Sequence, residues 1–223
     1  MHDYLINDVT LLAVATQEKW YNSTLKAIDY CLHNIHFKHV KFLSCKPSTS
    51  DHIEYIPIPT MSGQEYCIFM VLELHKYVHT PHVLCIHDDG FIINPNAWTD
   101  NFLQYDYIGA PWPEPHLSNH NINTSYRVGN GGFSLRSKKL LDILSLNEMT
   151  YQTRPEVEDV FICTTLRPSL ESKGIKFAPP DVAAQFSFEL STPENQGQTH
   201  SDRHSIKSFG FHARYSDALK FLE

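Results

Sequence analysis

Apolar residues fall into short runs separated by polar breaks, the pattern of a chain that alternates strands with helices. Buried strands are predicted at residues 9–15, 40–44 and 83–93, where aliphatic and β-branched side chains follow one another without helical spacing. Residues 53–59 alternate apolar and polar positions, and their prolines place them at the edge of a sheet.

Two helices are predicted between these strands. Residues 21–34 place apolar side chains at helical spacing. Ser62 and Glu65 match a capping box, which begins a helix over about 63–78. The resulting order is strand, helix, strand, strand, helix, strand. It predicts an α/β fold with a largely parallel, doubly wound sheet.

Composition narrows the class of protein. A chain of 223 residues suits one large α/β domain, and 42% hydrophobic with 19% charged residues is typical of globular proteins. A net charge of −7 without a basic tract argues against a nucleic-acid partner. The sequence has no apolar run of about 18 residues, so no membrane span is predicted.

Cysteine usage and the N-terminal residues point to one compartment. The 5 cysteines form no CxxC pair, which favours reduced thiols over a disulfide framework. Met1-His2-Asp3-Tyr4 lacks the basic and apolar regions of a signal peptide. The predicted location is cytoplasmic.

Candidate chemistry begins where the run at 83–93 is interrupted by His87-Asp88-Asp89-Gly90. Adjacent carboxylates must be solvated, paired or metal-bound, because charges are rarely buried alone. One interpretation is a set of oxygen ligands for a divalent cation at the carboxyl edge of the sheet. The other is a β-turn, for which Asp-Gly is common chemistry, and the residues alone leave both open.

Three further segments hold candidate functional residues: Gly129-Asn130-Gly131-Gly132, Glu158-Asp159 and His212. The glycine cluster lacks the ending of a phosphate loop and the spacing of a dinucleotide fingerprint, so a tight turn or bulge is the alternative to a ligand loop. Glu158-Asp159 also suits the first turn of a helix, where acids are stabilised. Taken singly, each segment has an ordinary structural explanation.

Taken in order, these segments resemble the GT-A glycosyltransferases. The closer resemblance is to a little-characterised family of glycosyltransferase-like domains from microbes and large DNA viruses. It rests on Asp89-Gly90, Tyr105-Asp106-Tyr107-Ile108-Gly109-Ala110-Pro111-Trp112, Gly129-Asn130-Gly131-Gly132-Phe133-Ser134-Leu135-Arg136, Glu158-Asp159-Val160-Phe161 and Phe209-Gly210-Phe211-His212. The resemblance implies a single GT-A-like domain over 1–223, with helices flanking the sheet. Residues 1–110 would bind a nucleotide-sugar, and 111–223 would form an acceptor and catalytic half with a metal-closing tail.

The resemblance also implies an activity. A hexosyltransferase-like enzyme would move sugar from a nucleotide-diphosphate-sugar, with UDP-sugars favoured, to a carbohydrate hydroxyl. Asp89 and His212 would hold Mn²⁺ or Mg²⁺. His87 stands where the DxD motif has its first acid, which leaves the metal requirement open. Glu158-Asp159 is similar to the motif of inverting β-1,3-type enzymes, so Asp159 is the expected base and Glu158 sets its pKa.

Binding residues follow from the same comparison. The expected donor-binding residues are Thr16, His87, Asp88, Arg127, Gly131 and Gly132, and the expected acceptor-binding residues are Trp112 and Asn130. Trp112 would stack on a sugar, with a buried core tryptophan as the alternative. The polar loop 113–126 is a candidate lid.

Two other functions stay open. A nucleotidyltransferase that makes nucleotide-sugars would have a glycine-rich, basic loop after the first strand, but Thr16-Gln17-Glu18-Lys19-Trp20 has no glycine. A non-catalytic carbohydrate-binding module would tolerate the loss of Asp159.

Overall fold

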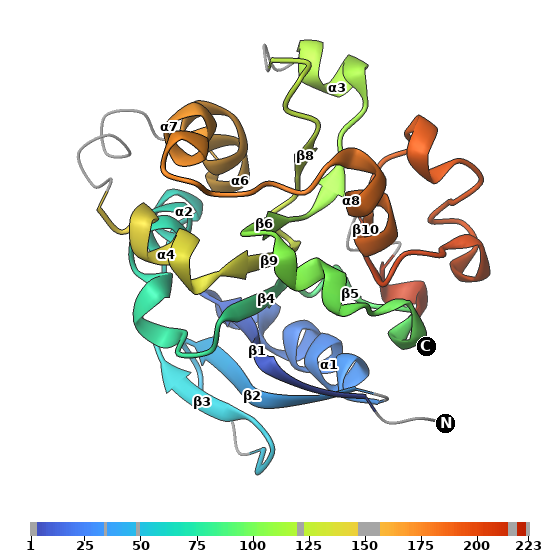
Figure 1. Cartoon of the computed structure of the whole chain (residues 1–223). Coiled ribbons are helices and arrows are strands. Elements are labelled where there is room, and N and C mark those ends of the chain that lie inside the picture. Colours follow the sequence, from blue (N-terminus) through green and yellow to red (C-terminus); the bar gives the residue numbers. More distant parts are fainter. Residues whose placement is uncertain are drawn as a thin grey trace.

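Six strands form the central sheet: β1 (Tyr4–Ala15), β2 (Ile35–Ser44), β3 (Glu54–Pro57), β4 (His82–Ile86), β6 (Tyr107–Ile108) and β9 (Phe133–Ser137). Their order is β3-β2-β1-β4-β9-β6 (Figure 1). The computed structural model describes residues 4–33, 35–47, 50–119, 123–146, 157–213 and 218–221. The first four strands are parallel, whereas β9 runs antiparallel to both β4 and β6. The sheet is therefore mixed and mainly parallel.

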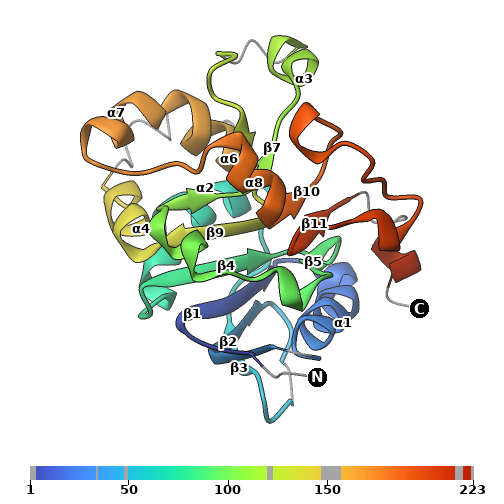
Figure 2. The ribbon, with the colours of Figure 1, turned by 45° about the vertical axis from the view of Figure 1, so that its right-hand side comes forward.

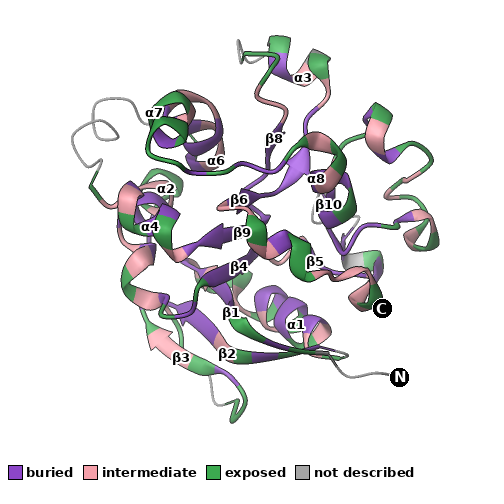
Figure 3. Ribbon diagram, in the orientation of Figure 1, coloured by how far each residue is buried: buried purple, intermediate pink, exposed green. Residues whose placement is uncertain are grey.

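Helices cover both faces of the sheet because the side chains of β1 alternate in direction. Leu11 and Ala13 pack in the same apolar cluster as residues of α1 (Tyr21–Cys31). Leu12 packs with residues of α2 (Gly63–Leu72) and α4 (Lys138–Leu144) on the other face. Figure 2 shows α1 on one side of the sheet and α2 and α4 on the other. Figure 3 shows the central strands as largely buried.

The start of α2 is as predicted. The Ser62 side chain accepts a hydrogen bond from the Glu65 amide, and the Glu65 carboxylate accepts one from the Ser62 amide. The helix is shorter than expected, because it ends at Leu72 and a 3₁₀ turn follows at Leu74–Tyr77. The helix expected over 21–34 ends at Cys31, and residue 34 lies outside the described part of the chain.

Two small sheets lie beside the central one, and the first of them ties the C-terminal part of the chain to the segment that follows β4. Strands β10 (Ser187–Phe188), β11 (Gly210–His212) and β5 (Gly90–Ile92) form one, in that order. Strands β7 (Ala110–Pro111) and β8 (Val128–Gly129) form the other. The apolar run at 83–93 is thus divided between two sheets.

The remaining helices are short: α3 (Glu114–Asn119), α6 (Glu158–Val160), α7 (Arg167–Ser172) and α8 (Pro180–Phe186), with a π-helical turn at Phe161–Thr165. The candidate lid at 113–126 begins as α3, and its residues 120–122 lie outside the described ranges. Single 3₁₀ turns occur at Glu18–Trp20, Pro95–Ala97, Asp100–Gln104, Pro193–Asn195, Arg203–Ser205 and Leu219–Phe221. The sequence did not predict α8.

The cysteines are free thiols, as expected for a chain without a disulfide framework. Within the described ranges, every helix is too short or too polar to cross a lipid bilayer.

Candidate active site

A cleft of about 290 Å³ opens at the carboxyl ends of β1 and β4, lined by Val14, Thr16, Gln17, Trp20, Thr24, Gly63, Tyr66, His87, Asp88 and Asp89. The chain leaves β1 toward β2 on one side, and β4 lies on the other, so the sheet order reverses here. Ligands of open α/β sheets bind at such switch points. A larger groove, about 550 Å³, lies beside the end of α1 and the start of β2, away from this edge.

The acidic pair lies at the tip of a tight turn. The His87 amide donates to the Gly90 carbonyl at 3.2 Å, and the Gly90 amide donates back at 3.3 Å. Asp88 and Asp89 are the two residues between them. The interpretation as a β-turn is therefore confirmed, and the turn stands at the carboxyl edge of the sheet, where the cation ligands were predicted. The Ser23 hydroxyl donates to Asp88 at 2.8 Å, while burial raises the pKa of that carboxyl.

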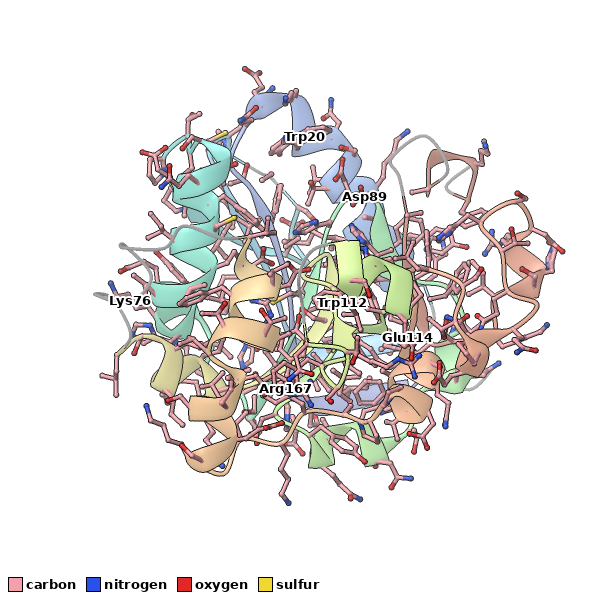
Figure 4. All side chains as sticks on the ribbon, turned by 90° about the horizontal axis from the view of Figure 1, so that it is seen from above. Trp20, Lys76, Asp89, Trp112, Glu114 and Arg167 are labelled. Carbon is pink, nitrogen blue, oxygen red and sulfur yellow. The ribbon has the colours of Figure 1, made fainter. Side chains whose placement is uncertain are left out.

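Strand pairing brings His212 against Asp89. In the antiparallel β5–β11 ladder His212 lies opposite Gly90, and the Ala213 amide donates to the Asp89 carbonyl at 2.9 Å. His212 Nε2 lies 3.3 Å from Asp89 Oδ1, and Nδ1 lies 3.0 Å from Glu189 Oε1. In the view from above, Asp89 lies between Trp20 and Trp112 (Figure 4).

The charges of this cluster are mutually stabilising. Burial by itself lowers the pKa of His212, but hydrogen bonds and charge from Asp89 and Glu189 outweigh it and raise the pKa to about 10. Burial raises the pKa of Asp89, and the hydrogen bond and charge of His212 reverse this, so the pKa lies below its ordinary value. Burial lowers the pKa of His87, which favours the neutral imidazole.

A metal ion fits this cluster. His87, Asp89 and His212 each offer one ligand atom, and these atoms all lie within 4.8 Å of one another. No other group of three such side chains meets this criterion among the residues that the structure describes. Imidazole nitrogen and carboxylate oxygen are common ligands of divalent metals.

The glycine turn connects the cluster to Asp159. The Gly131 amide donates to Asp159 Oδ2 at 3.0 Å. A Cβ atom on Gly132 would lie 2.3 Å from His212 Nε2, so this residue packs directly against the imidazole. Asn130 adopts φ 77°, and its side-chain oxygen accepts from the Gly132 amide at 2.9 Å, which closes the turn. Two adjacent glycines therefore lie between the candidate base and the candidate metal ligands.

Asp159 lies in an environment that disfavours its charge. Burial raises its pKa to about 7, and the charges of Glu158 and Glu189 add to the effect, against hydrogen bonds from the Val160 and Gly131 amides. Glu158 is 3% exposed and pairs at 3.2 Å with Arg136, which is 0% exposed. Glu158 thus has a buried cation beside it, whereas burial raises the pKa of the neighbouring Asp159 carboxyl.

Three residues that were predicted to bind the donor or the acceptor either lie outside the cleft lining or are buried. Arg127 forms a bidentate ion pair with Glu194, at 2.7 and 2.9 Å, and is not among the residues lining the cleft. Trp112 is 2% exposed and donates its indole N–H to Glu189 at 3.3 Å, which fits the alternative of a core tryptophan. Asn130 is 1% exposed. Their direct ligand contacts remain predictions.

Several residues that hold the cluster in place were not predicted from the sequence. Glu189 links His212 to Trp112, and the Tyr66 hydroxyl lies 2.6 Å from His87 Nε2. Ser23 holds Asp88. Glu189 directly follows β10, and nothing in its neighbouring residues relates it to His212 or Trp112.

Comparison with known proteins supports the fold. The family described as "Protein of unknown function (DUF5672)" matches residues 54–212. No curated protein matches the sequence. A glycosyltransferase involved in the glycosylation of the major capsid of PBCV-1 is similar in structure, with TM-score 0.54, 13% identity, and coverage of 96% of this chain and 98% of that one. An active-site mutant of LgtC has TM-score 0.52 and 12% identity, over 94% and 87% of the two chains. The fold is GT-A-like.

Substitution of Gly132 by alanine should separate His212 from Asp89, because the added Cβ would overlap the imidazole. We expect a loss of about 1–3 kcal/mol in the free energy of unfolding, typical of overpacking. Urea denaturation measures the loss, and the His212 imidazole signals in NMR report its displacement. Gly63→Ala is the matched control, because a Cβ there meets nothing within 4 Å. Equal stability of the two variants would contradict the tight contact.

Substitution of Asp159 by asparagine should stabilise the protein at high pH. The folded pKa of about 7 exceeds the ordinary value of 3.8, so folding favours the protonated carboxyl. Its relative contribution to stability is full below pH 3.8 and is lost as pH rises through 7. Asparagine imitates the protonated form, so the variant should melt about 5 °C higher at pH 8 and gain little at pH 4. Asp51→Asn, at an exposed turn, is the control. A gain independent of pH would refute the assignment.

Proposed function

The chain belongs to the DUF5672 family, and we propose that it is a glycosyltransferase that moves a sugar from a nucleotide-diphosphate-sugar to a carbohydrate hydroxyl. Residues 1–110 are assigned to the donor, and residues 111–223 to the acceptor and to catalysis. A UDP-sugar is the favoured donor, Mn²⁺ or Mg²⁺ the metal, and the cytoplasm the location.

The observation behind this proposal is a convergence of distant segments. Asp89 and His212 form a pair beside the cleft, and Asp159 binds the glycine turn that packs against His212. This convergence supports a metal site and a base close to a cavity at the edge of the sheet where α/β proteins bind ligands.

On the donor side, the cleft offers groups suited to a nucleotide. Thr16 and Gln17 lie at its wall, Trp20 supplies an aromatic side chain, and Asp88 supplies a carboxylate. Asp89 and His212 would hold the cation next to these groups. A cation held there would neutralise the charge that develops on the diphosphate leaving group.

On the acceptor side, Asp159 serves as the general base. A base whose pKa lies near 7 is half ionised at neutral pH and still accepts a proton effectively. Asp159 takes the proton of the acceptor hydroxyl as its oxygen attacks the anomeric carbon and the diphosphate leaves. Burial and the charge of Glu158, which pairs with Arg136, raise the pKa of Asp159. Attack opposite the leaving group inverts the anomeric centre.

The two alternative functions, a nucleotidyltransferase and a carbohydrate-binding module, fit the structure less well than a glycosyltransferase. After β1 the chain enters a 3₁₀ turn at Glu18–Trp20 rather than a glycine-rich loop, which disfavours a nucleotidyltransferase. A binding module has no need of a buried acid with a pKa near neutrality, yet only turnover separates this reading from a transferase.

Asp159→Asn should lower turnover by about 10²–10⁴-fold while donor affinity stays within about twofold, because the base contributes to the chemical step and not to donor binding. The donor is first identified by thermal shift with UDP-, GDP- and CMP-sugars, with and without Mn²⁺. Turnover is then measured as release of nucleoside diphosphate with candidate acceptors.

Asp51→Asn, at an exposed turn, serves as the control for a lost carboxylate. Unchanged turnover in Asp159→Asn would exclude it as the base. If no nucleotide-sugar stabilises the protein, both enzymatic functions fail. Sugar binding without turnover would favour the binding module.

A further inference from the structure

We propose that His87 is a metal ligand, and that the His87–Asp89–His212 site selects transition-metal ions that accept imidazole, excluding Mg²⁺. The inference rests on the proposed function only in assuming that the cleft takes a divalent cation. It adds a ligand and an ion preference, neither of which follows from the fold.

The distances suit three ligands of one ion. His212 Nε2 lies 3.3 Å from Asp89 Oδ1, and His87 Nδ1 lies 4.0 Å from the same oxygen. Ligand atoms about 2.1 Å from a shared ion stand roughly 3 Å apart. The His212–Asp89 side is already at that spacing, and His87 needs to approach by about 1 Å.

Both imidazoles are oriented by partners at the opposite nitrogen. The Tyr66 hydroxyl lies 2.6 Å from His87 Nε2, and Glu189 Oε1 lies 3.0 Å from His212 Nδ1. When these oxygens accept the ring N–H groups, His87 Nδ1 and His212 Nε2 are the nitrogens that face Asp89, and a bound ion would displace the proton of His212 Nε2. Metal-ligating histidines usually donate their other N–H to such a partner, which fixes the tautomer and ring orientation.

The outer partners are themselves held in place. The second oxygen of Glu189 accepts the indole N–H of Trp112 at 3.3 Å. The backbone of His87 is anchored as well, because its amide donates to the Gly132 carbonyl at 2.9 Å.

The composition of the ligand set determines the ion preference. Mg²⁺ prefers an octahedron of oxygen ligands, whereas imidazole suits later transition metals. Affinity at nitrogen-containing sites rises from Mn²⁺ to Co²⁺ along the divalent series. Two imidazoles and one carboxylate should therefore bind Co²⁺ more tightly than Mn²⁺, and both far more tightly than Mg²⁺.

The direct test counts imidazole nitrogens on the bound ion. The metal-free protein is loaded with Mn²⁺, with and without UDP, and electron spin-echo modulation is recorded. We expect two coordinated ¹⁴N nuclei in the wild type and one in His87→Ala. Calorimetric titration should show a 10–100-fold weaker Mn²⁺ affinity in His87→Ala and a smaller loss in Tyr66→Phe, which removes the outer partner. The exposed His79 provides the control variant His79→Ala, which should match the wild type.

Ion preference is tested by a second substitution. His87→Asp replaces nitrogen with oxygen and should reduce the ratio of Co²⁺ to Mg²⁺ affinity at least tenfold. Because the count of nitrogens in the wild type needs no variant, a failure of His87→Ala to fold leaves the inference testable.

One nitrogen in the wild type, equal affinities for Mg²⁺ and Co²⁺, or no bound ion in either condition would overturn the inference. The transferase proposal is judged separately by nucleotide-sugar binding and turnover. A protein that turns over a donor with Mg²⁺ and shows no second imidazole would keep its function and lose this site.

Discussion

The candidate site depends on the antiparallel ladder between β5 and β11. The ladder joins residues far apart in the chain, and its register sets His212 opposite Gly90, one residue after Asp89. Packing reinforces it, because the Phe91 and Phe211 rings lie edge to face with centroids 4.7 Å apart. A slip of one residue would turn His212 to the other face of the small sheet. The tail is therefore part of the site and not an appendage to it.

A second constraint is the buried charge next to the candidate base. Arg136 and Glu158 have almost no exposed surface, and such pairs add little net stability because both ions lose their hydration. Removing one partner, however, leaves an uncompensated charge and typically costs about 3–5 kcal/mol. The pair thus makes the acidic side chain of Glu158 tolerable beside Asp159, whose pKa is raised by burial and by the charge of Glu158. The buried Arg136–Glu158 ion pair is thus linked to the pKa of the candidate base.

Local patterns in the sequence predicted much of the structure of residues 1–110. The apolar run of β1, the capping box at Ser62 and the acids after β4 are read from neighbouring residues, and the structure has all three. The fold class followed from the order of these elements. Long-range partners could not be read in the same way.

Tyr66, Glu189 and Trp112 act through contacts with residues distant in sequence, and no spacing rule relates them. Arg127 has the same charge whether it faces a phosphate or Glu194. The glycines illustrate the limit: their cluster was predicted as a ligand loop or a turn, and what demands small residues is the proximity of His212 and Glu158. Side-chain burial and partner choice are properties of the packed chain.

His87 replaces the first acid of a DxD motif, and nearby carboxylates compensate for the negative charge that is lost. Where a DxD motif would place a first acid, this chain has an imidazole that burial favours as neutral, so the ligand atoms lose one negative charge. Asp88 lies at the tip of the same turn and Glu189 contacts His212 from behind. Carboxylates thus stay next to the proposed site without having to ligate an ion, and their negative potential would attract a cation. In this arrangement the charge that would attract a cation is separate from the atoms that would select it.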